Sequence, residues 1–333
     1  MSRRELNGWA MHLSKWAGYK IRVPAGSAST DATRLHLLAC VLFLLALHLP
    51  SRLIAQDVGT LRQDVTFESQ ILKRKIAASV YLPGNYGSQT SILERFPVVY
   101  LLHGLGDDHT AWPRLGKIKP TLDRLIDTGQ LTPLIVVMPD ADRSWYVNDA
   151  RQKGFGRVFD AFRTDLISAV DRRLRTVPCK NGRAIGGLSM GGYGALLLGL
   201  AEPDKFAAVF SLSGAVFPEN LSEDPKRRRW LASLFGGVHG EPIDDARLKR
   251  WNIFDRLKAI DPQRDHPHVW LSTGDDDAFI SIVSGSVRVY QFLQERKIPS
   301  ELRIDDAGHD WSYWQKSVAP ALVWASKRLR SSC

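Results

Sequence analysis

The stretch AIGGLSMGGYG, residues 184–194, decides the fold and contains the pattern G-x-S-x-G around Ser189. Residues 183–188 read as a short apolar strand, and the residues after Ser189 read as a helix. A serine on so sharp a connection crowds the positions two residues away, and glycine at 187 and 191 removes the side chains that would clash. The strand–turn–helix context predicts a nucleophilic Ser189 held above the carboxyl edge of a sheet.

The same glycines have an alternative explanation, a turn that packs a helix against a strand in a dinucleotide-binding fold. That fold places its glycines in the first strand–helix turn and an acidic residue about 20 positions further on. Here the motif lies in the middle of the chain, so we favour the nucleophile. The N–H of Met190, at the start of the helix, is then a candidate donor to a developing oxyanion.

Further short apolar segments on both sides of this motif predict the rest of the sheet. Continuous apolar runs of this length are typical of parallel strands buried on both faces. Helical patterns separate them, the clearest at 158–174 and 281–295, and the alternation predicts a doubly wound α/β sheet of the α/β-hydrolase type. The first two strands of the sheet are expected at 66–72 and 76–82 and should pair in antiparallel fashion. The parallel strands are expected at 97–102, 134–138, 183–188, 207–212, 268–272 and 301–304.

Residues 216–260 interrupt this alternation with a run of glycines and prolines. We interpret the segment as an insertion over the carboxyl edge of the sheet, where it can shape a substrate pocket. An ordinary long crossover between two strands is the alternative.

The general base predicted for Ser189 is His309. A serine hydroxyl needs a base to take its proton, and in this fold the order along the chain is Ser, acid, His. Only His309 follows both Ser189 and the acidic cluster at 275–277. A metal site on His266 and His268 would lack further ligands. We therefore expect no metal and no cofactor.

The acid that orients His309 should leave the end of the strand at 268–272, which runs directly into Asp275, Asp276 and Asp277. Its role is to hold the imidazole tautomer and to stabilise the charged ring. The residue pattern does not separate the three aspartates. The alternative is that all three are solvated loop acids.

A second oxyanion donor is expected in the loop after the strand at 97–102, which reads HGLGDD at 103–108. Gly104 and Gly106 allow the backbone to approach a ligand closely, which indicates the N–H of Leu105 as the donor. His103 is interpreted as a hydrogen-bonding residue beneath the oxyanion hole.

Composition limits the partners. The chain has 333 residues, is 44% hydrophobic and carries a net charge of +10, part of which comes from basic residues before position 56. The basic run at 226–229 is interpreted as a solvated face, because the chain contains no nucleic-acid-binding module. We expect no nucleic-acid partner. Nothing in the sequence indicates the oligomeric state.

The apolar segment 35–49 follows Arg34 and is typical of a secretory signal. It is shorter than the roughly 20 residues that span a bilayer, so an uncleaved anchor is the alternative and would be the only contact with a membrane. We therefore divide the chain into a leader, 1–56, and a catalytic domain, 57–333, and we expect the protein to be secreted or periplasmic.

Cys179 and Cys333 can pair in an oxidising compartment. We expect two separate thiols.

Six short sequence motifs together resemble those of the esterase family that includes feruloyl esterases, S-formylglutathione hydrolases and antigen 85 mycolyltransferases. The resemblance spans about residues 65–326 and is nearest to small tributyrin-type carboxylesterases. It implies Ser189 as nucleophile, His309 as base, and Leu105 and Met190 as oxyanion donors. It also selects Asp277, the fourth residue of G-x-x-D at 274–277. The motifs are VVYLLHG, LIVVMPD, SWY, GLSMGGYGA, SLSGA and GHDWSYW.

Departures from the family pattern narrow the substrate. The oxyanion loop has Gly106 and Asp107 where formylglutathione hydrolases resemble H-G-L-T-C, which disfavours a glutathione thioesterase. We expect a carboxylesterase acting on short acyl esters or on feruloyl or acetyl groups of carbohydrate. A secreted acyltransferase of the mycolyltransferase type is the alternative. Of the aromatic residues that can line the pocket, we single out Trp145. The others are Trp112, Tyr146, Trp311, Tyr313 and Trp314.

Overall fold

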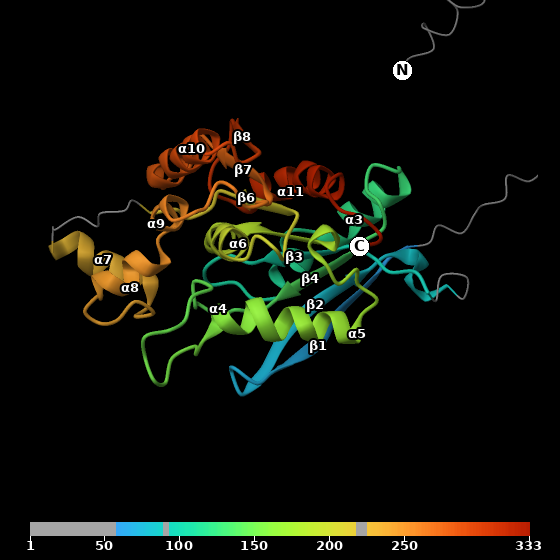
Figure 1. Cartoon of the computed structure of the whole chain (residues 1–333), viewed down its shortest axis with the longest axis horizontal. Helices are drawn as coiled ribbons and strands as arrows, with labels where there is room; N and C mark the ends of the chain where they lie inside the picture. The colour runs from blue at the N-terminus through green and yellow to red at the C-terminus, as the bar shows by residue number, and fades with distance from the viewer. Residues whose placement is uncertain (1–57, 89–92, 218–224) are drawn as a thin grey trace, which may run out of the picture. The chain divides into compact units, whose positions relative to one another are not determined.

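The computed structural model describes residues 58–88, 93–217 and 225–333, and the leader lies outside them. An eight-stranded sheet has the order β1-β2-β4-β3-β5-β6-β7-β8 (Figure 1). β1 pairs with β2, and β2 with β4, in antiparallel fashion, whereas every later pair is parallel. The strands are β1 (Thr60–Ser69), β2 (Arg74–Leu82), β3 (Val98–Leu102), β4 (Ile135–Pro139), β5 (Arg183–Leu188), β6 (Ala208–Leu212), β7 (His268–Gly274) and β8 (Ser300–Asp305).

Both faces of β3 to β7 are buried, as their apolar sequences predicted, whereas the parallel edge strand β8 is partly exposed. In β3, Val98 and Tyr100 belong to one core, while Val99 and Leu101 belong to the other. Helices α4 (Val158–Ala161), α5 (Ile167–Arg173), α6 (Met190–Ala201) and α10 (Ile280–Glu295) pack into the first core. Helices α3 (Ile118–Asp127) and α11 (Trp311–Ser326) pack into the second, beside the short α2 (Ala111–Arg114). The predicted doubly wound α/β fold is confirmed.

The helix predicted at 158–174 is present but is not uniform. A π-helical turn, Phe162–Leu166, separates α4 from α5. The apolar residues spaced four apart still face the sheet, and Val158, Phe162, Leu166 and Val170 are all buried. Short 3₁₀ turns at Gly84–Gly87 and Lys180–Gly182 complete the connections.

The described part of the insertion between β6 and β7 contains three helices, α7 (Pro225–Phe235), α8 (Asp245–Trp251) and α9 (Ile253–Lys258). Side-chain oxygens cap two of them, because Asp244 accepts from the N–H of Ala246 and Asn252 accepts from the N–H of Phe254. Such caps satisfy backbone donors that the first helical turn leaves without partners. Figure 1 shows α7 and α8 at one end of the sheet.

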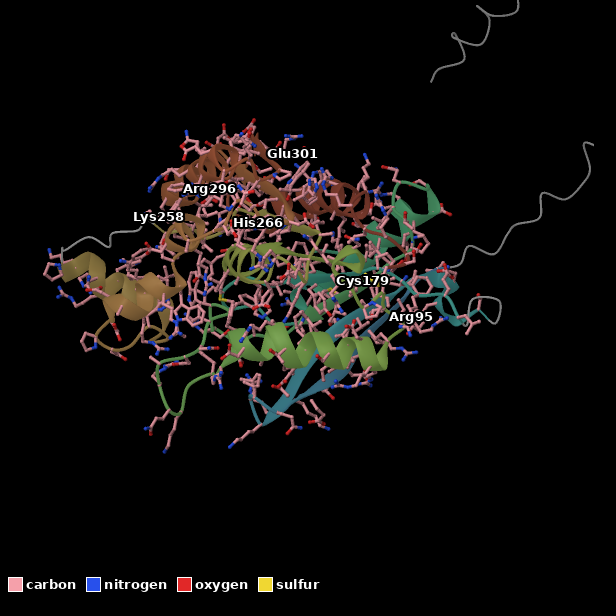
Figure 2. The ribbon with its side chains drawn as sticks, viewed as in Figure 1. Arg95, Cys179, Lys258, His266, Arg296 and Glu301 are labelled. Carbon is pink, nitrogen blue, oxygen red and sulfur yellow. A yellow bond between two sulfur atoms is a disulfide. The ribbon has the colours of Figure 1, made fainter. Side chains whose placement is uncertain are left out.

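The expectation of two separate thiols is wrong, because Cys179 and Cys333 form a disulfide, with Cα atoms 6.1 Å apart (Figure 2, Cys179). The C-terminal tail runs back past the turn before β5, where the Arg330 N–H donates to the Asn181 carbonyl. The two cysteines are 154 positions apart, so no local pattern indicated that they meet. Within the described ranges, no helix is both long and apolar enough to cross a membrane.

Candidate active site

Ser189 lies on the turn between β5 and α6 with φ 51° and ψ −117°, a conformation that side chains rarely adopt. The surrounding backbone holds it there, since the Ser189 N–H donates to the Leu212 carbonyl at 2.9 Å. A Cβ at Gly187 would lie 2.7 Å from the Gly191 backbone, and one at Gly191 would lie 2.6 Å from the Leu102 carbonyl oxygen. The turn therefore requires both glycines, for the reason that the motif suggested.

His309 reaches this serine from the loop between β8 and α11. Its Nε2 lies 3.0 Å from the Ser189 Oγ. The next residue, Asp310, caps α11 by accepting from the Ser312 and Tyr313 N–H groups, which fixes the end of the loop. The imidazole packs edge-to-face between the rings of Phe279 and Trp314, with centroids 5.3 and 5.0 Å away. The ring is thus held toward Ser189 from both sides.

Asp277 is the one aspartate of the 275–277 cluster that contacts His309. Its Oδ2 lies 2.7 Å from the His309 Nδ1, and its Oδ1 accepts from the Phe279 N–H at 2.9 Å. Asp277 is buried, whereas Asp275 and Asp276 are exposed and lie near Asp306. A proton on Nδ1, donated to this carboxylate, leaves Nε2 free to accept the serine hydroxyl proton.

Of the two predicted oxyanion donors, Met190 directly follows Ser189 and Leu105 lines the same cavity as Ser189. Met190 is the first residue of α6, so the helix itself provides no partner for its N–H. Leu105 belongs to the loop after β3, where the His103 Nε2 accepts from the Ala141 N–H and the Nδ1 therefore donates to the Gly104 carbonyl. In the trans peptide bond between Gly104 and Leu105, the Leu105 N–H points in the opposite direction from the Gly104 carbonyl. By holding that carbonyl, His103 therefore sets the direction of the Leu105 N–H.

The end of β3 is fixed from below by two further buried side chains. The Trp112 Nε1 donates to the Leu102 carbonyl, and the Tyr146 hydroxyl donates to the His103 carbonyl, both at 3.0 Å. Both aromatic residues act beneath the oxyanion loop, which explains why neither lines the cavity.

A cavity of about 360 Å³ opens over Ser189 and His309. Trp145 forms part of its wall and is fixed there because its Nε1 donates to the Leu234 carbonyl at 3.3 Å. Trp311 and Trp314 also line the cavity, whereas Tyr313 packs under it. Sequence reasoning missed the apolar lining residues supplied by the insertion and by the start of α10. These are Phe217, Trp230, Leu234, Phe279 and Ile282.

One acidic side chain, Asp107, also lines the cavity. Partial burial raises the pKa of its carboxyl group, and the nearby His103 and Arg114 oppose that rise. Because the other lining side chains are mostly apolar or aromatic, Asp107 places a negative charge in the wall of a cavity that is otherwise largely uncharged. Its position directly after Gly106 was visible in the sequence, but no motif assigned it to the cavity.

The sheet order and the serine at the β5–α6 turn define a protein of the α/β-hydrolase fold. A family model described as "Putative esterase" matches residues 69–325. The chain belongs to this esterase family and is a carboxylic ester hydrolase.

Relatives and solved structures agree with this class. An endo-1,4-beta-xylanase/feruloyl esterase of Xylanibacter ruminicola is 36% identical over 175 residues, which are 51% of this chain and 24% of that protein. An acetyl esterase of Caldicellulosiruptor saccharolyticus is 26% identical and aligns over 79% of this chain and 97% of its own length. A ferulic acid esterase structure is 27% identical, covers 81% of this chain and 98% of its own, and superposes with a TM-score of 0.65.

Proposed function

We propose that this protein is a serine carboxylesterase in which Ser189 is the nucleophile, His309 the general base and Asp277 the residue that orients His309. The observation that carries the proposal is the continuous chain of hydrogen bonds from Asp277 through His309 to Ser189 at the floor of the cavity. A weak nucleophile, its base and an orienting acid in hydrogen-bond contact are what covalent acyl transfer requires.

The chemistry would proceed in two halves. The Ser189 Oγ attacks the ester carbonyl carbon while its proton passes to the His309 Nε2, and the N–H groups of Leu105 and Met190 stabilise the carbonyl oxygen as it becomes an oxyanion. Collapse of this intermediate breaks the ester bond, and His309 returns the proton to the departing alcohol. Water then attacks the acyl group on Ser189 and gives a proton to His309. The bond to the Ser189 Oγ breaks, His309 returns that proton to the Oγ, and the carboxylic acid leaves.

The substrate we propose is a short acyl ester or a feruloyl or acetyl ester of a carbohydrate. The cavity is small and largely aromatic, which favours a compact or planar acyl group over a long alkyl chain. The relatives are named for feruloyl and acetyl esters, and the chain aligns over nearly the full length of the acetyl esterase. Trp145 would contact the acyl group from the cavity wall.

We also propose that the protein works outside the cytoplasm, with residues 1–56 as the leader. The Cys179–Cys333 disulfide supports this compartment, because such bonds persist where the environment is oxidising. The apolar run at 35–49 supports it independently.

A panel of p-nitrophenyl esters from acetate to palmitate, with methyl ferulate and acetylated xylan, tests the proposed function. Acetate and butyrate esters should exceed the palmitate ester in kcat/KM, without activation at an oil interface. Faster turnover of long chains would indicate a lipase, and diversion of most acyl groups to a sugar acceptor would indicate a transferase.

Fluorophosphonate labelling tests the role of Ser189 separately. Ser189→Ala should lose the label and lower kcat on the order of 10⁶-fold, with an unchanged circular dichroism spectrum. Ser281→Ala, which alters another serine of the same cavity, should keep both label and turnover. Undiminished labelling of Ser189→Ala would overturn the assignment.

A further inference from the structure

A second cavity, of about 540 Å³, is lined by residues of α4 and of the insertion helices α8 and α9. Figure 1 labels these three helices, and Lys258, labelled in Figure 2, ends α9. Five arginines and two aspartates line it, so positive side chains exceed negative ones by three. We refer to it as the arginine cavity. The arginines are Arg157, Arg163, Arg247, Arg250 and Arg256.

The acidic residues of the arginine cavity are already neutralised. Asp160 forms ion pairs with Arg157 at 2.5 Å and with Arg163 at 3.1 Å, and it also accepts from the Asn148 side chain. Asp149 pairs with Arg151 at 2.8 Å. Neither carboxylate is therefore available to balance the remaining three arginines.

Among the described residues, Arg247, Arg250 and Arg256 form no ion pair. Arg247 donates from one terminal nitrogen to the Asn148 carbonyl at 2.7 Å, while its buried Nε has no partner. Arg256 lies over the rings of Phe159 and Trp251, at 5.4 and 5.5 Å from their centroids, and its buried Nε also lacks a partner.

Arg250 is the second guanidinium over the ring of Trp251, at 5.8 Å, and its side chain is exposed. The Nε1 of Trp251 is buried and has no hydrogen-bond partner either. Burial lowers the pKa of the Arg256 guanidinium and the positive charge of Arg250 lowers it further, whereas Tyr193 and Glu202 oppose this shift. Arg247 and Arg256 are half-buried and form no ion pair, and partly desolvated charges of this kind are stabilised when an anion joins them.

We propose that the arginine cavity binds an oxyanion group, the phosphate, sulfate or carboxylate of a small molecule or of an acidic sugar. The planar guanidinium presents several N–H donors in a fixed fork that matches these groups. The anion would bind to the terminal nitrogens of Arg250 and Arg256 and complete the charge balance that Asp149 and Asp160 do not supply. This site goes beyond the proposed ester chemistry and does not depend on it.

A short chain of contacts connects the arginine cavity to the active-site cavity. The Tyr193 hydroxyl donates to the Trp251 carbonyl at 2.7 Å, and the Tyr193 ring packs edge-to-face on Trp145, with centroids 5.9 Å apart. The insertion contributes residues to both cavities, Trp230 and Leu234 to one and Arg247 and Trp251 to the other. An anion that stabilises the insertion would therefore also stiffen one wall of the active site.

Calorimetric titration at pH 7 and constant ionic strength tests the proposal, using inorganic phosphate, sulfate and glucuronate, with glucose as the neutral sugar. We expect saturable binding of at least one oxyanion and none of glucose. Preference for phosphate or sulfate over glucuronate would identify a tetrahedral anion, and the reverse preference an acidic sugar.

Variants distinguish this site from general salt effects, which matter because phosphate and sulfate also stabilise folded proteins by exclusion from their surfaces. Arg250→Ala and Arg256→Gln should each raise the Kd at least tenfold. Lys249→Ala removes the same charge from an exposed neighbour on α8 and should leave the Kd unchanged. Arg250 is exposed, so its variant should fold even if Arg256→Gln does not. Equal affinity in Arg250→Ala and the unaltered protein, or no saturable binding of any oxyanion, would overturn the proposal.

Discussion

The carboxyl edge of the sheet and the insertion α7–α9 border the same cavity but are built differently. At the sheet edge, each reacting side chain is placed by hydrogen bonds, from Asp277 to His309 and from His309 to Ser189. In the insertion, aromatic contacts dominate, and Phe235 packs edge-to-face on both Trp145 and Phe217 at 5.1 Å.

This difference assigns separate tasks to the two regions. Hydrogen bonds fix atoms to a few tenths of an ångström, which proton transfer requires. Aromatic packing fills space and excludes water, and it requires less exact geometry than hydrogen bonds do. It is therefore suited to discrimination among acyl groups. Changes at the sheet edge should therefore alter kcat by large factors, and changes in the insertion should alter stability and substrate preference by smaller ones.

Apart from loss of the nucleophile itself, the largest effect is expected from Asp277→Asn. Loss of the carboxylate would leave the imidazole in the wrong tautomer, with losses on the order of 10⁴ in kcat. Asp275→Asn and Asp276→Asn remove equal charges from exposed neighbours and should change kcat little. Steady-state kinetics of the three variants on one soluble butyrate ester would measure these changes in kcat. A comparable loss of kcat in Asp276→Asn would show that Asp277 is not the orienting acid.

His239, in the insertion, should make stability depend on pH. It is buried against Phe235, and burial, aided by the charge of Arg247, lowers its pKa to about 4. The unfolded chain, with an ordinary pKa near 6.5, binds this proton more readily, so stability is complete above about pH 6.5 and falls as the pH decreases toward 4. When His239 is fully protonated, the free energy of unfolding is lower by roughly 3 kcal/mol than when it is neutral.

Urea unfolding of the unaltered protein and of His239→Gln between pH 4 and 8 measures this contribution. The variant should lose less stability between pH 6.5 and 4. Comparison at pH 8, where the histidine is neutral in both states, isolates the packing cost of the substitution. Parallel pH profiles would show that His239 does not titrate as its burial implies.

Trp230→Ala should change substrate preference while leaving the chemistry intact. Trp230 lies on α7 with 51% of its side chain exposed and also lines the cavity. Removal of one wall of an apolar pocket typically costs about tenfold in kcat/KM for the group that fills it. We expect that loss for methyl ferulate and almost none for p-nitrophenyl acetate. Arg229→Ala, on the same helix, is the control, and equal losses for both esters would assign Trp230 a purely structural role.

The smallest effect is expected from Asp107→Asn, which removes the negative charge from the cavity. Esters with an anionic acyl group, such as a hemisuccinate, should gain about fivefold relative to the neutral butyrate, since a carboxylate near the surface repels another by roughly 1 kcal/mol. Asp108→Asn removes a neighbouring charge that lies outside the cavity lining. A hemisuccinate-to-butyrate ratio unchanged in Asp107→Asn would show that this carboxylate does not contact substrate.

The sequence predicted the sheet well because its signals are local. The apolar runs that became β3 to β8 are each bounded correctly to within two residues, and the glycines around Ser189 revealed the turn. The residues now proposed as nucleophile and base were identifiable because each follows a strand end in a known order. That order did not separate Asp277 from Asp275 and Asp276, and only the resemblance to the esterase family selected it.

The cavity wall was less predictable because it depends on how the insertion packs. Phe217 and Trp230 come from a segment without regular periodicity, and nothing in their neighbours' sequence indicates that they face Ser189. The π-helical turn in the 158–174 segment was also hidden, because spacing of four residues is compatible with both helix types. The disulfide was missed because it depends on where the C-terminal tail lies.

That disulfide has a topological consequence. Cys179 precedes β5 and Cys333 follows α11, so Ser189, Asp277, His309 and the whole insertion lie inside one covalent ring. A protease that cuts the insertion once would open the ring without releasing a fragment. On a non-reducing gel, such a singly cut protein would still migrate as one species, and only a reductant would separate the part that carries Ser189 from the part that carries His309.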